Sequence, residues 1–327
     1  MDHTTEHQSQ KTNTNHISRS VLVTGGAGYV GSVLVPALLE RNYKVRVMDN
    51  LMYGGRGLIP CLINKNFEFM RGDVRDASAM ESALQGVDLV IHLAAIVGYP
   101  ACKKHPELAQ TVNFEATKLL AQTRSKDIPI LFGSTGSNYG AIVGEICTEE
   151  TPLNPVSLYG ETKTEAEKLL LDSGNVVCYR FATAFGASNR MRFDLLVNDF
   201  VYQAVRNKNI TVYEKSFKRT FIHTHDMVRS FLFAIDNYDR LRDNVFNVGS
   251  ERMNYSKEDI ANEVKKRAEY YLHFAEFGTD EDKRNYEVSY AKIQALGFDT
   301  TVSLEEGIDE LIKAAGMLDI NNEFSNV

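Results

Sequence analysis

A chain of 327 residues, 43% of them hydrophobic, is long enough to bury the core of one large domain or of two modest ones. Its net charge of −7 argues against nucleic acid or an anionic membrane surface as the main partner, and we expect neither. No hydrophobic run is long enough to span a bilayer and the N-terminus lacks an apolar signal core, so we expect a cytoplasmic protein. The four cysteines are widely spaced and are expected to be reduced thiols: Cys61, Cys102, Cys147 and Cys178.

The chain begins with a polar stretch and continues with a strand, a glycine-rich turn and a helix. Residues 1–19 lack any period that would bury a face, so we expect a disordered tail. An apolar strand over 21–23 and a helix over 32–41 flank the turn, whose three glycines are Gly25, Gly28 and Gly31. Their spacing suits a tight turn, close backbone approach to a diphosphate and close packing of helix on strand, and the helix would direct free N–H groups at the phosphates. This unit predicts a dinucleotide-binding site.

A second strand, over 44–48, ends at Asp49, close to the distance from the turn at which a carboxylate accepts hydrogen bonds from an adenosine ribose. Arg56, in the loop that follows, could reach a 2′-phosphate and would then favour NADP. Because Asp49 would repel that phosphate, we expect NAD.

Strands and helices alternate up to about residue 185, as expected for an α/β fold. The further strands are predicted over 67–70, 88–95, 128–132 and 176–181, and the helices over 77–84, 106–125 and 157–171, with a loop over 141–156. The strand over 88–95 ends in Leu93, Ala94 and Ala95, where small side chains permit close approach by a cofactor. Beyond residue 185 the period is less regular; helices are expected over 193–205, 226–237, 256–268 and 304–318, and strands over 210–213, 220–223 and 245–248.

Tyr159 and Lys163 lie four residues apart on a predicted helix, so they share one face. A lysine ammonium near a phenol stabilises the phenolate and lowers its pKa from the usual value of about 10. Tyr159 could then act as general base toward a substrate hydroxyl while hydride passes to a nicotinamide, and Thr135, at the end of a neighbouring strand, could hydrogen-bond the same hydroxyl. A Tyr-x-x-x-Lys pair is common on solvated helices, but the glycine turn upstream favours the catalytic interpretation.

With these residues in place, the chain resembles an extended short-chain dehydrogenase/reductase of the nucleotide-sugar epimerase and dehydratase group, over about residues 21–318. The motifs that carry the resemblance are Thr24-Gly25-Gly26-Ala27-Gly28-Tyr29-Val30-Gly31, Asp49-Asn50, Gly72-Asp73-Val74, His92-Leu93-Ala94-Ala95, Ser134-Thr135 with Tyr139-Gly140, Tyr159 with Lys163, Arg219 before Phe221-Ile222-His223, and Asp282-Lys283-Arg284 before Leu296-Gly297-Phe298.

The resemblance implies a Rossmann-type, doubly wound parallel sheet with a smaller C-terminal α/β substrate-binding domain. The NAD-binding domain would cover 20–183, with 222–248 returning to it, and the nucleotide-sugar domain would cover 184–221 and 249–321.

By the same resemblance, particular residues acquire roles. Tyr29, Val30 and Asn50 would belong to the cofactor site, Asp73 and Val74 would contact adenine, and Lys163 would contact the nicotinamide ribose. Arg219 and Arg284 would bind the diphosphate or nucleoside of the substrate, as a guanidinium fork can. The alternative for these arginines is a surface ion pair.

Two departures from the family pattern bear on the reaction. Members that eliminate water carry an acidic pair directly after the threonine, where this chain has Gly136 and Ser137, so 4,6-dehydration is disfavoured. Ala182-Thr183, after Arg180-Phe181, stands where many members place an asparagine that touches the sugar or diphosphate of the substrate. The stretch over 190–200 resembles a subgroup that includes GDP-heptose C4-dehydrogenases, which implies Arg192 and Asn198 as substrate contacts.

We therefore expect an NAD-dependent oxidoreductase that acts on C4 of a nucleotide-diphosphate sugar, with a 4-epimerase as the first hypothesis. A C4-dehydrogenase that releases a 4-keto sugar is the alternative within the class, and a non-catalytic NAD-binding sensor is the alternative of another class. No metal is expected, since His223 and His225 share a strand face without an evident third ligand. The resemblance also implies a homodimer.

Overall fold

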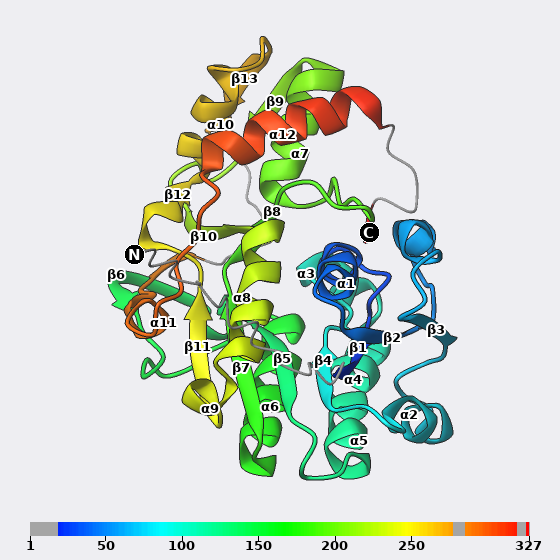
Figure 1. The fold of residues 1–327 in the computed structure, drawn as a ribbon. Helices are drawn as coiled ribbons and strands as arrows, with labels where there is room; N and C mark the ends of the chain where they lie inside the picture. Colours follow the sequence, from blue (N-terminus) through cyan, green and yellow to red (C-terminus); the bar gives the residue numbers. More distant parts are fainter. Residues whose placement is uncertain (1–18, 277–284, 319–324, 327) are drawn as a thin grey trace, which may run out of the picture.

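The computed structural model describes residues 19–276, 285–318 and 325–326. Its main feature is a seven-stranded parallel sheet, in the lower half of Figure 1, with a second layer of helices and short strands above it. In spatial order the strands are β11 (Asn244–Val248), β7 (Val176–Phe181), β5 (Ile130–Thr135), β4 (Leu89–His92), β1 (Ser20–Thr24), β2 (Lys44–Asp49) and β3 (Phe67–Arg71). The strand order reverses between β1 and β4, so the crevice at their carboxyl ends is where such sheets bind ligands. The predicted doubly wound α/β fold is confirmed.

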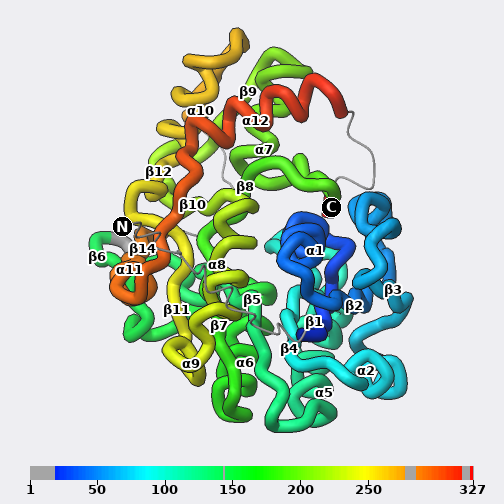
Figure 2. The backbone as a smooth tube through the Cα atoms, viewed as in Figure 1, coloured from blue at the N-terminus to red at the C-terminus, as the bar shows by residue number. Residues whose placement is uncertain are grey.

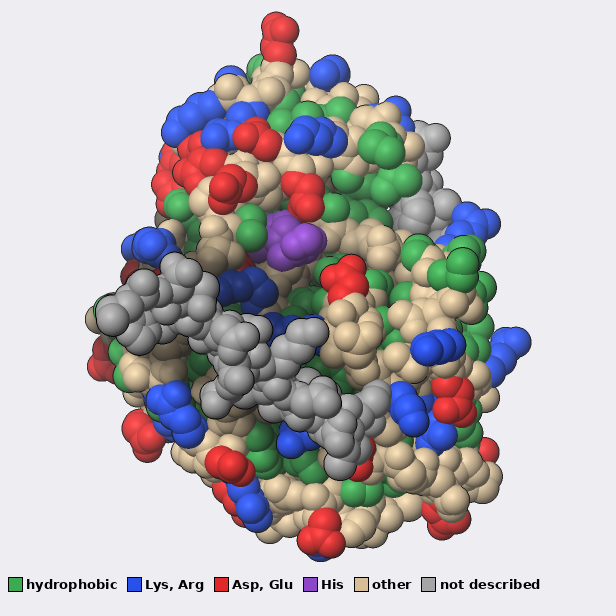
Figure 3. Space-filling model, in the orientation of Figure 1, with side chains coloured by type: hydrophobic (Ala, Val, Ile, Leu, Met, Phe, Trp, Pro, Cys, Tyr) green, Lys and Arg blue, Asp and Glu red, His purple; other side chains and the backbone are tan. Residues whose placement is uncertain are grey.

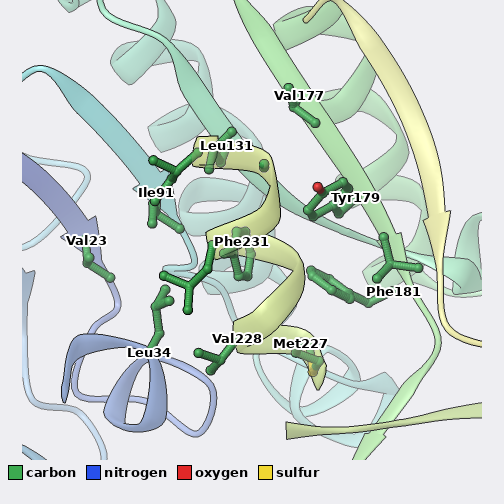
Figure 4. Close-up of a cluster of buried hydrophobic side chains, with 14 of the residues drawn as sticks. Val23, Leu34, Ile91, Leu131, Val177, Tyr179, Phe181, Met227, Val228 and Phe231 are labelled. Carbon is green, nitrogen blue, oxygen red and sulfur yellow. The ribbon is translucent and has the colours of Figure 1, made fainter. Parts of the chain in front are cut away.

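Helices cover both faces of this sheet because successive strand residues point to opposite sides. One face packs against α1 (Gly31–Glu40) and α8 (Thr224–Asp236); the other packs against α2 (Ala77–Leu84), α3 (Tyr99–Lys104), α4 (Pro106–Gln110), α5 (Ala116–Thr123) and α6 (Leu158–Ser173). On the first face, Leu34 of α1 and Phe231 of α8 lie beside Ile91 and Leu131 of the sheet (Figure 4).

The second layer is smaller and has its own apolar core, which includes Phe185, Phe200 and Leu311. It contains a three-stranded sheet of β12 (Asn254–Ser256), β10 (Lys218–His223) and β8 (Thr183–Phe185), and a parallel pair of β9 (Asn209–Val212) with β13 (Tyr271–Phe274). The helices of this layer are α7 (Leu196–Tyr202), α10 (Lys257–Lys265) and α12 (Leu304–Met317), seen together at the top of Figure 2. Two short helices, α9 (Tyr238–Leu241) and α11 (Ala291–Gln294), lie beside the main sheet.

Several predicted elements need correction. The loop predicted over 141–156 contains β6 (Ala141–Cys147), which pairs with β14 (Asn285–Val288) in parallel. The helix predicted over 106–125 is divided by a π-helical turn over 111–115. The helix predicted to begin at residue 193 begins at Leu196. The predicted tail lies outside the described residues except for Arg19, whose carbonyl oxygen accepts a hydrogen bond from Lys44 N at 3.0 Å. The limits of the two predicted domains stay a prediction.

The four cysteines are free thiols and buried. On the face shown in Figure 3, Lys and Arg side chains are interspersed with Asp and Glu. Over the described ranges, no helix is both long enough and apolar enough to cross a bilayer.

Candidate active site

The glycine turn joins β1 to α1 and leaves no room for a side chain at Gly25 or Gly31. Gly25 has a φ of +71°, and a Cβ there would lie 2.7 Å from Ala94 N, while a Cβ on Gly31 would lie 2.6 Å from Gly25 O. Gly28 N donates to Gly25 O at 3.1 Å and so closes the turn. Only glycine fits the two crowded positions, so the backbone itself forms the surface of the crevice, as a cofactor diphosphate requires.

Asp49 lies at the end of β2 on the rim of the same crevice. Its carboxylate accepts hydrogen bonds from Ala27 N at 3.0 Å and from Leu51 N at 2.8 Å, which fixes its orientation. Burial raises the pKa of this carboxyl, while the two backbone donors lower it. Nearby, hydrogen bonds from Arg75 hold the pKa of Asp73 at about 2, so Asp73 is a second ionised carboxylate at the same end of the crevice as Asp49.

A single cleft runs from this acidic end along the glycine turn to Tyr159. All predicted cofactor-binding residues line it: Gly25, Gly28, Tyr29, Val30, Asp49, Asn50, Asp73, Val74, Leu93, Ala94, Ala95, Tyr159 and Lys163. Thr135 and Arg192 line it as well. Residues that are far apart in the chain, and that the sequence predicted as one site, therefore line one cleft in the fold.

Thr135, Tyr159 and Lys163 all line this cleft. Thr135 ends β5, and its Oγ1 accepts a hydrogen bond from Ser137 N at 3.1 Å. Ser157 caps α6 by accepting a hydrogen bond from Gly160 N at 3.2 Å, which fixes the helix turn that carries Tyr159. Lys163 is buried, with its Nζ 3.8 Å from the centre of the Phe132 ring. Burial lowers the pKa of Lys163 to about 7.

A buried polar network supports this end of the cleft from behind. Glu167 forms an ion pair with Arg180 at 2.6 Å, and both side chains are less than a tenth exposed. Glu167 also accepts hydrogen bonds from Ser134 Oγ at 2.6 Å and from Asn138 Nδ2 at 3.2 Å. Since Ser134 and Asn138 flank Thr135 and the turn after it, the ion pair holds the strand end in place.

The turn after Thr135 is tight at Gly136, the first of the two positions where dehydrating members carry an acidic pair. A Cβ on Gly136 would lie 3.3 Å from both Phe181 O and the hydroxyl of Tyr286. A side chain at this position would require Phe181 O and the Tyr286 ring to shift by a few tenths of an ångström. At Thr183, which lines the cleft, the buried Oγ1 has no hydrogen-bond partner among the described residues.

The predicted substrate residues are not all on the cleft. Arg192 lines it and is paired with Asp194. Asn198 is completely buried: its Oδ1 accepts a hydrogen bond from Gly186 N at 3.1 Å, and its Nδ2 donates to Arg192 O at 2.8 Å. Arg219 lies buried in β10 and does not line the cleft, and Arg284 lies outside the described residues.

The two histidines considered for a metal do not share a strand face, because His223 ends β10 whereas His225 lies in α8. His223 Nε2 lies 2.7 Å from a carboxylate oxygen of Glu310, and its ring packs against His225. Among the described residues, no group of three or more His, Cys, Asp or Glu side chains could hold a metal ion.

Arg190 also lines the cleft, and the sequence did not predict it as a site residue. It lines the cleft beside Tyr53, two positions before Arg192. The available signal was the pair of arginines in one short segment, but their spacing alone does not show which of them faces the cleft.

Comparison with known proteins agrees with this geometry. The model of the NAD dependent epimerase/dehydratase family matches residues 21–249. A putative UDP-glucose 4-epimerase of Methanocaldococcus jannaschii is 27% identical, covering 89% of this chain and 97% of its own length. The uncharacterized UDP-glucose epimerase YtcB of Bacillus subtilis is 30% identical, covering 88% and 95%.

Among solved structures, UDP-glucuronic acid 4-epimerase from Bacillus cereus, in complex with UDP-glucuronic acid and NAD, superposes with a TM-score of 0.82 at 26% identity, covering 91% of this chain and 99% of that one. The family match spans the glycine turn, Asp49, Thr135, Tyr159 and Lys163. This chain is an enzyme of the NAD dependent epimerase/dehydratase family, which acts on nucleotide sugars with NAD as its cofactor.

Proposed function

We propose that the enzyme is a 4-epimerase of a nucleotide-diphosphate sugar. The observation that carries this proposal is that Thr135, Tyr159 and Lys163 line one cleft with the glycine turn, while Gly136 and Ser137 stand where the dehydrating members carry an acidic pair. The first part supports oxidation at a carbinol carbon, and the second disfavours the elimination of water. The names of the two relatives and of the Bacillus cereus neighbour make UDP-sugars the first substrates to test.

Each residue has a task in the proposed reaction. Thr135 orients the C4 hydroxyl of the sugar by hydrogen bonding, and Tyr159, as phenolate, accepts the proton of that hydroxyl. When bound, NAD supplies the acceptor, and later the donor, of the hydride on C4. Lys163, once protonated, stabilises the phenolate by its charge. Rotation of the 4-keto sugar presents its other face to the returning hydride, and Tyr159 then returns the proton to the oxygen, so no net oxidation occurs.

The test is to incubate the purified enzyme with a panel of UDP-, GDP- and dTDP-sugars and to follow both product stereochemistry by NMR and absorbance at 340 nm. Inversion at C4 without accumulating NADH is the expected result. Accumulation of NADH and a keto sugar would establish the C4-dehydrogenase instead. Tyr159→Phe should abolish turnover while retaining NAD binding, and tight NAD binding without turnover of any sugar by the wild type would favour the sensor.

We further propose that the enzyme is a cytoplasmic homodimer. The family resemblance supports this assembly, and partly buried apolar side chains on the outer helices, Leu108 and Leu119, are compatible with it. Light scattering coupled to size-exclusion chromatography distinguishes a dimer of about twice 36.7 kDa from a monomer.

A further inference from the structure

Arg190 is anchored by its backbone at the phosphate-binding end of α1. Its N–H donates to Ser32 Oγ at 3.0 Å, and Asn189 Nδ2 donates to Ser32 O at 2.9 Å. One position earlier, Ser188 Oγ donates to Tyr29 O at 2.6 Å. The segment that leads into the second layer is therefore fixed against the first turn of α1, directly beside the glycine turn.

The side chain of Arg190 lies in the cleft with little compensation for its charge. The residue is 4% exposed, and its guanidinium lies 4.4 Å from the centre of the Tyr53 ring. Its Nη2 donates to Ser325 O at 3.4 Å, while its Nε has no hydrogen-bond partner among the described residues. None of the ion pairs found in the described part of the chain includes Arg190, whereas Arg192 is paired with Asp194.

Burial, followed by the charge of Arg192, lowers the pKa of Arg190 to about 10. The group remains a cation at neutral pH. The charges of Asp194 and Asp49 offset part of this lowering of the pKa, but no ion pair in the described residues joins either carboxylate to Arg190. An anion in the cleft would therefore further stabilise the buried cation.

We propose that Arg190 binds the diphosphate of the dinucleotide cofactor, beside the glycine turn and the first turn of α1. A dinucleotide cofactor has two anionic groups that Arg190 could bind, the diphosphate and, in NADP, the ribose 2′-phosphate. The carboxylate of Asp49 lies at the expected ribose end and repels a phosphate there, whereas the positive end of the α1 dipole favours one beside the glycine turn. A guanidinium with an open Nε edge can donate two parallel hydrogen bonds to phosphate oxygens.

This assignment depends on dinucleotide binding and not on which reaction follows. It therefore fails or holds separately from the proposed 4-epimerase. Cofactor binding would then also depend on the segment that leads into the second layer, and not on the glycine turn alone.

The test measures binding to cofactor-free protein by titration calorimetry and ligand-observed NMR, with ADP-ribose and adenosine as probes. ADP-ribose contains the diphosphate and adenosine does not. Arg190→Met, which retains the apolar stem, should weaken ADP-ribose binding by about 10- to 100-fold and leave adenosine binding unchanged. Arg190→Lys should give an intermediate affinity. The control is Arg41→Met, which removes an exposed arginine paired with Asp236 and should change neither affinity.

Equal weakening of both probes would show that Arg190 only supports the fold, and unchanged ADP-ribose binding would likewise overturn the proposal. A loss confined to NADP would reassign Arg190 to a 2′-phosphate. If Arg190→Met does not fold, Arg190→Lys decides: a loss for ADP-ribose alone supports the diphosphate role, and any other pattern contradicts it.

Discussion

Breaking the ion pair between Glu167 and Arg180 should destabilise the enzyme strongly. Arg180→Met would leave the Glu167 carboxylate, 1% exposed, with hydrogen bonds from Ser134 and Asn138 but without its cation. Removing one partner of a buried pair typically costs about 3–5 kcal/mol of unfolding free energy. With an unfolding entropy of roughly 0.6 kcal/mol/K for a chain of about 300 ordered residues, this corresponds to a fall in Tm of about 5–8 °C.

The double variant Glu167→Gln/Arg180→Met tests the physical reason. It buries no charge, and the glutamine oxygen can still accept the hydrogen bonds of Ser134 and Asn138, so it should recover at least half of the lost stability. Scanning calorimetry and urea unfolding measure both variants. NAD binding, measured in parallel, shows whether each variant keeps the cleft folded. A loss below about 1 kcal/mol in Arg180→Met, or a double variant no more stable than the single one, would refute the reasoning.

Three further predictions concern the cleft. Burial holds the pKa of Lys163 near 7, far below the unfolded value of about 10.4. The cofactor-free wild type should therefore gain stability relative to Lys163→Met as the pH rises from 7 to 10, by at most about 1.4 kcal/mol per pH unit. Urea unfolding across that range measures the difference, and parallel pH profiles of the two proteins would contradict the prediction. Asp49→Ser should reduce the preference for NAD over NADP by about tenfold, since a like charge no longer opposes the 2′-phosphate. Titration with both cofactors measures the ratio of their affinities, and an unchanged ratio would argue against the role of Asp49. Gly31→Ala would place a Cβ 2.6 Å from Gly25 O and should cost about 1–3 kcal/mol of stability together with most NAD binding. The matched change Gly316→Ala, in open space within α12, should be neutral to slightly stabilising. Thermal melts with and without NAD measure both variants, and equal behaviour of the two would exclude steric crowding at the turn.

The cofactor half of the site could be predicted from the sequence because local chemistry determines it. Gly25 and Gly31 are required where backbones approach closely, and the residues that follow a buried parallel strand, such as Asp49, necessarily lie at the ligand-binding edge. The strands were recognisable for a similar reason, because runs such as 176–181 are mostly apolar and are buried on both faces of the sheet.

The remainder depends on contacts between distant parts of the chain. The strand β6 pairs with β14, about 140 residues later, and its own sequence, with Gly144 at a φ of +86°, does not resemble a strand. The same limit applies to Asn198. Its residue type suits a substrate contact, but in the fold its amide is engaged by Gly186 and Arg192 inside the second layer.

The contact between Tyr29 and the second layer has a consequence for protein engineering. Tyr29, within the glycine turn, donates its hydroxyl hydrogen to Gly186 O at 2.6 Å and accepts a hydrogen bond from Asn198 Nδ2 at 3.1 Å. A chimera that takes residues 184–221 from a relative to change the accepted sugar would break this contact unless tyrosine, asparagine and the glycine backbone were transferred together. Recombination between relatives should therefore succeed only where the crossover keeps these three groups matched, which makes the glycine turn a determinant of compatibility between substrate-binding parts.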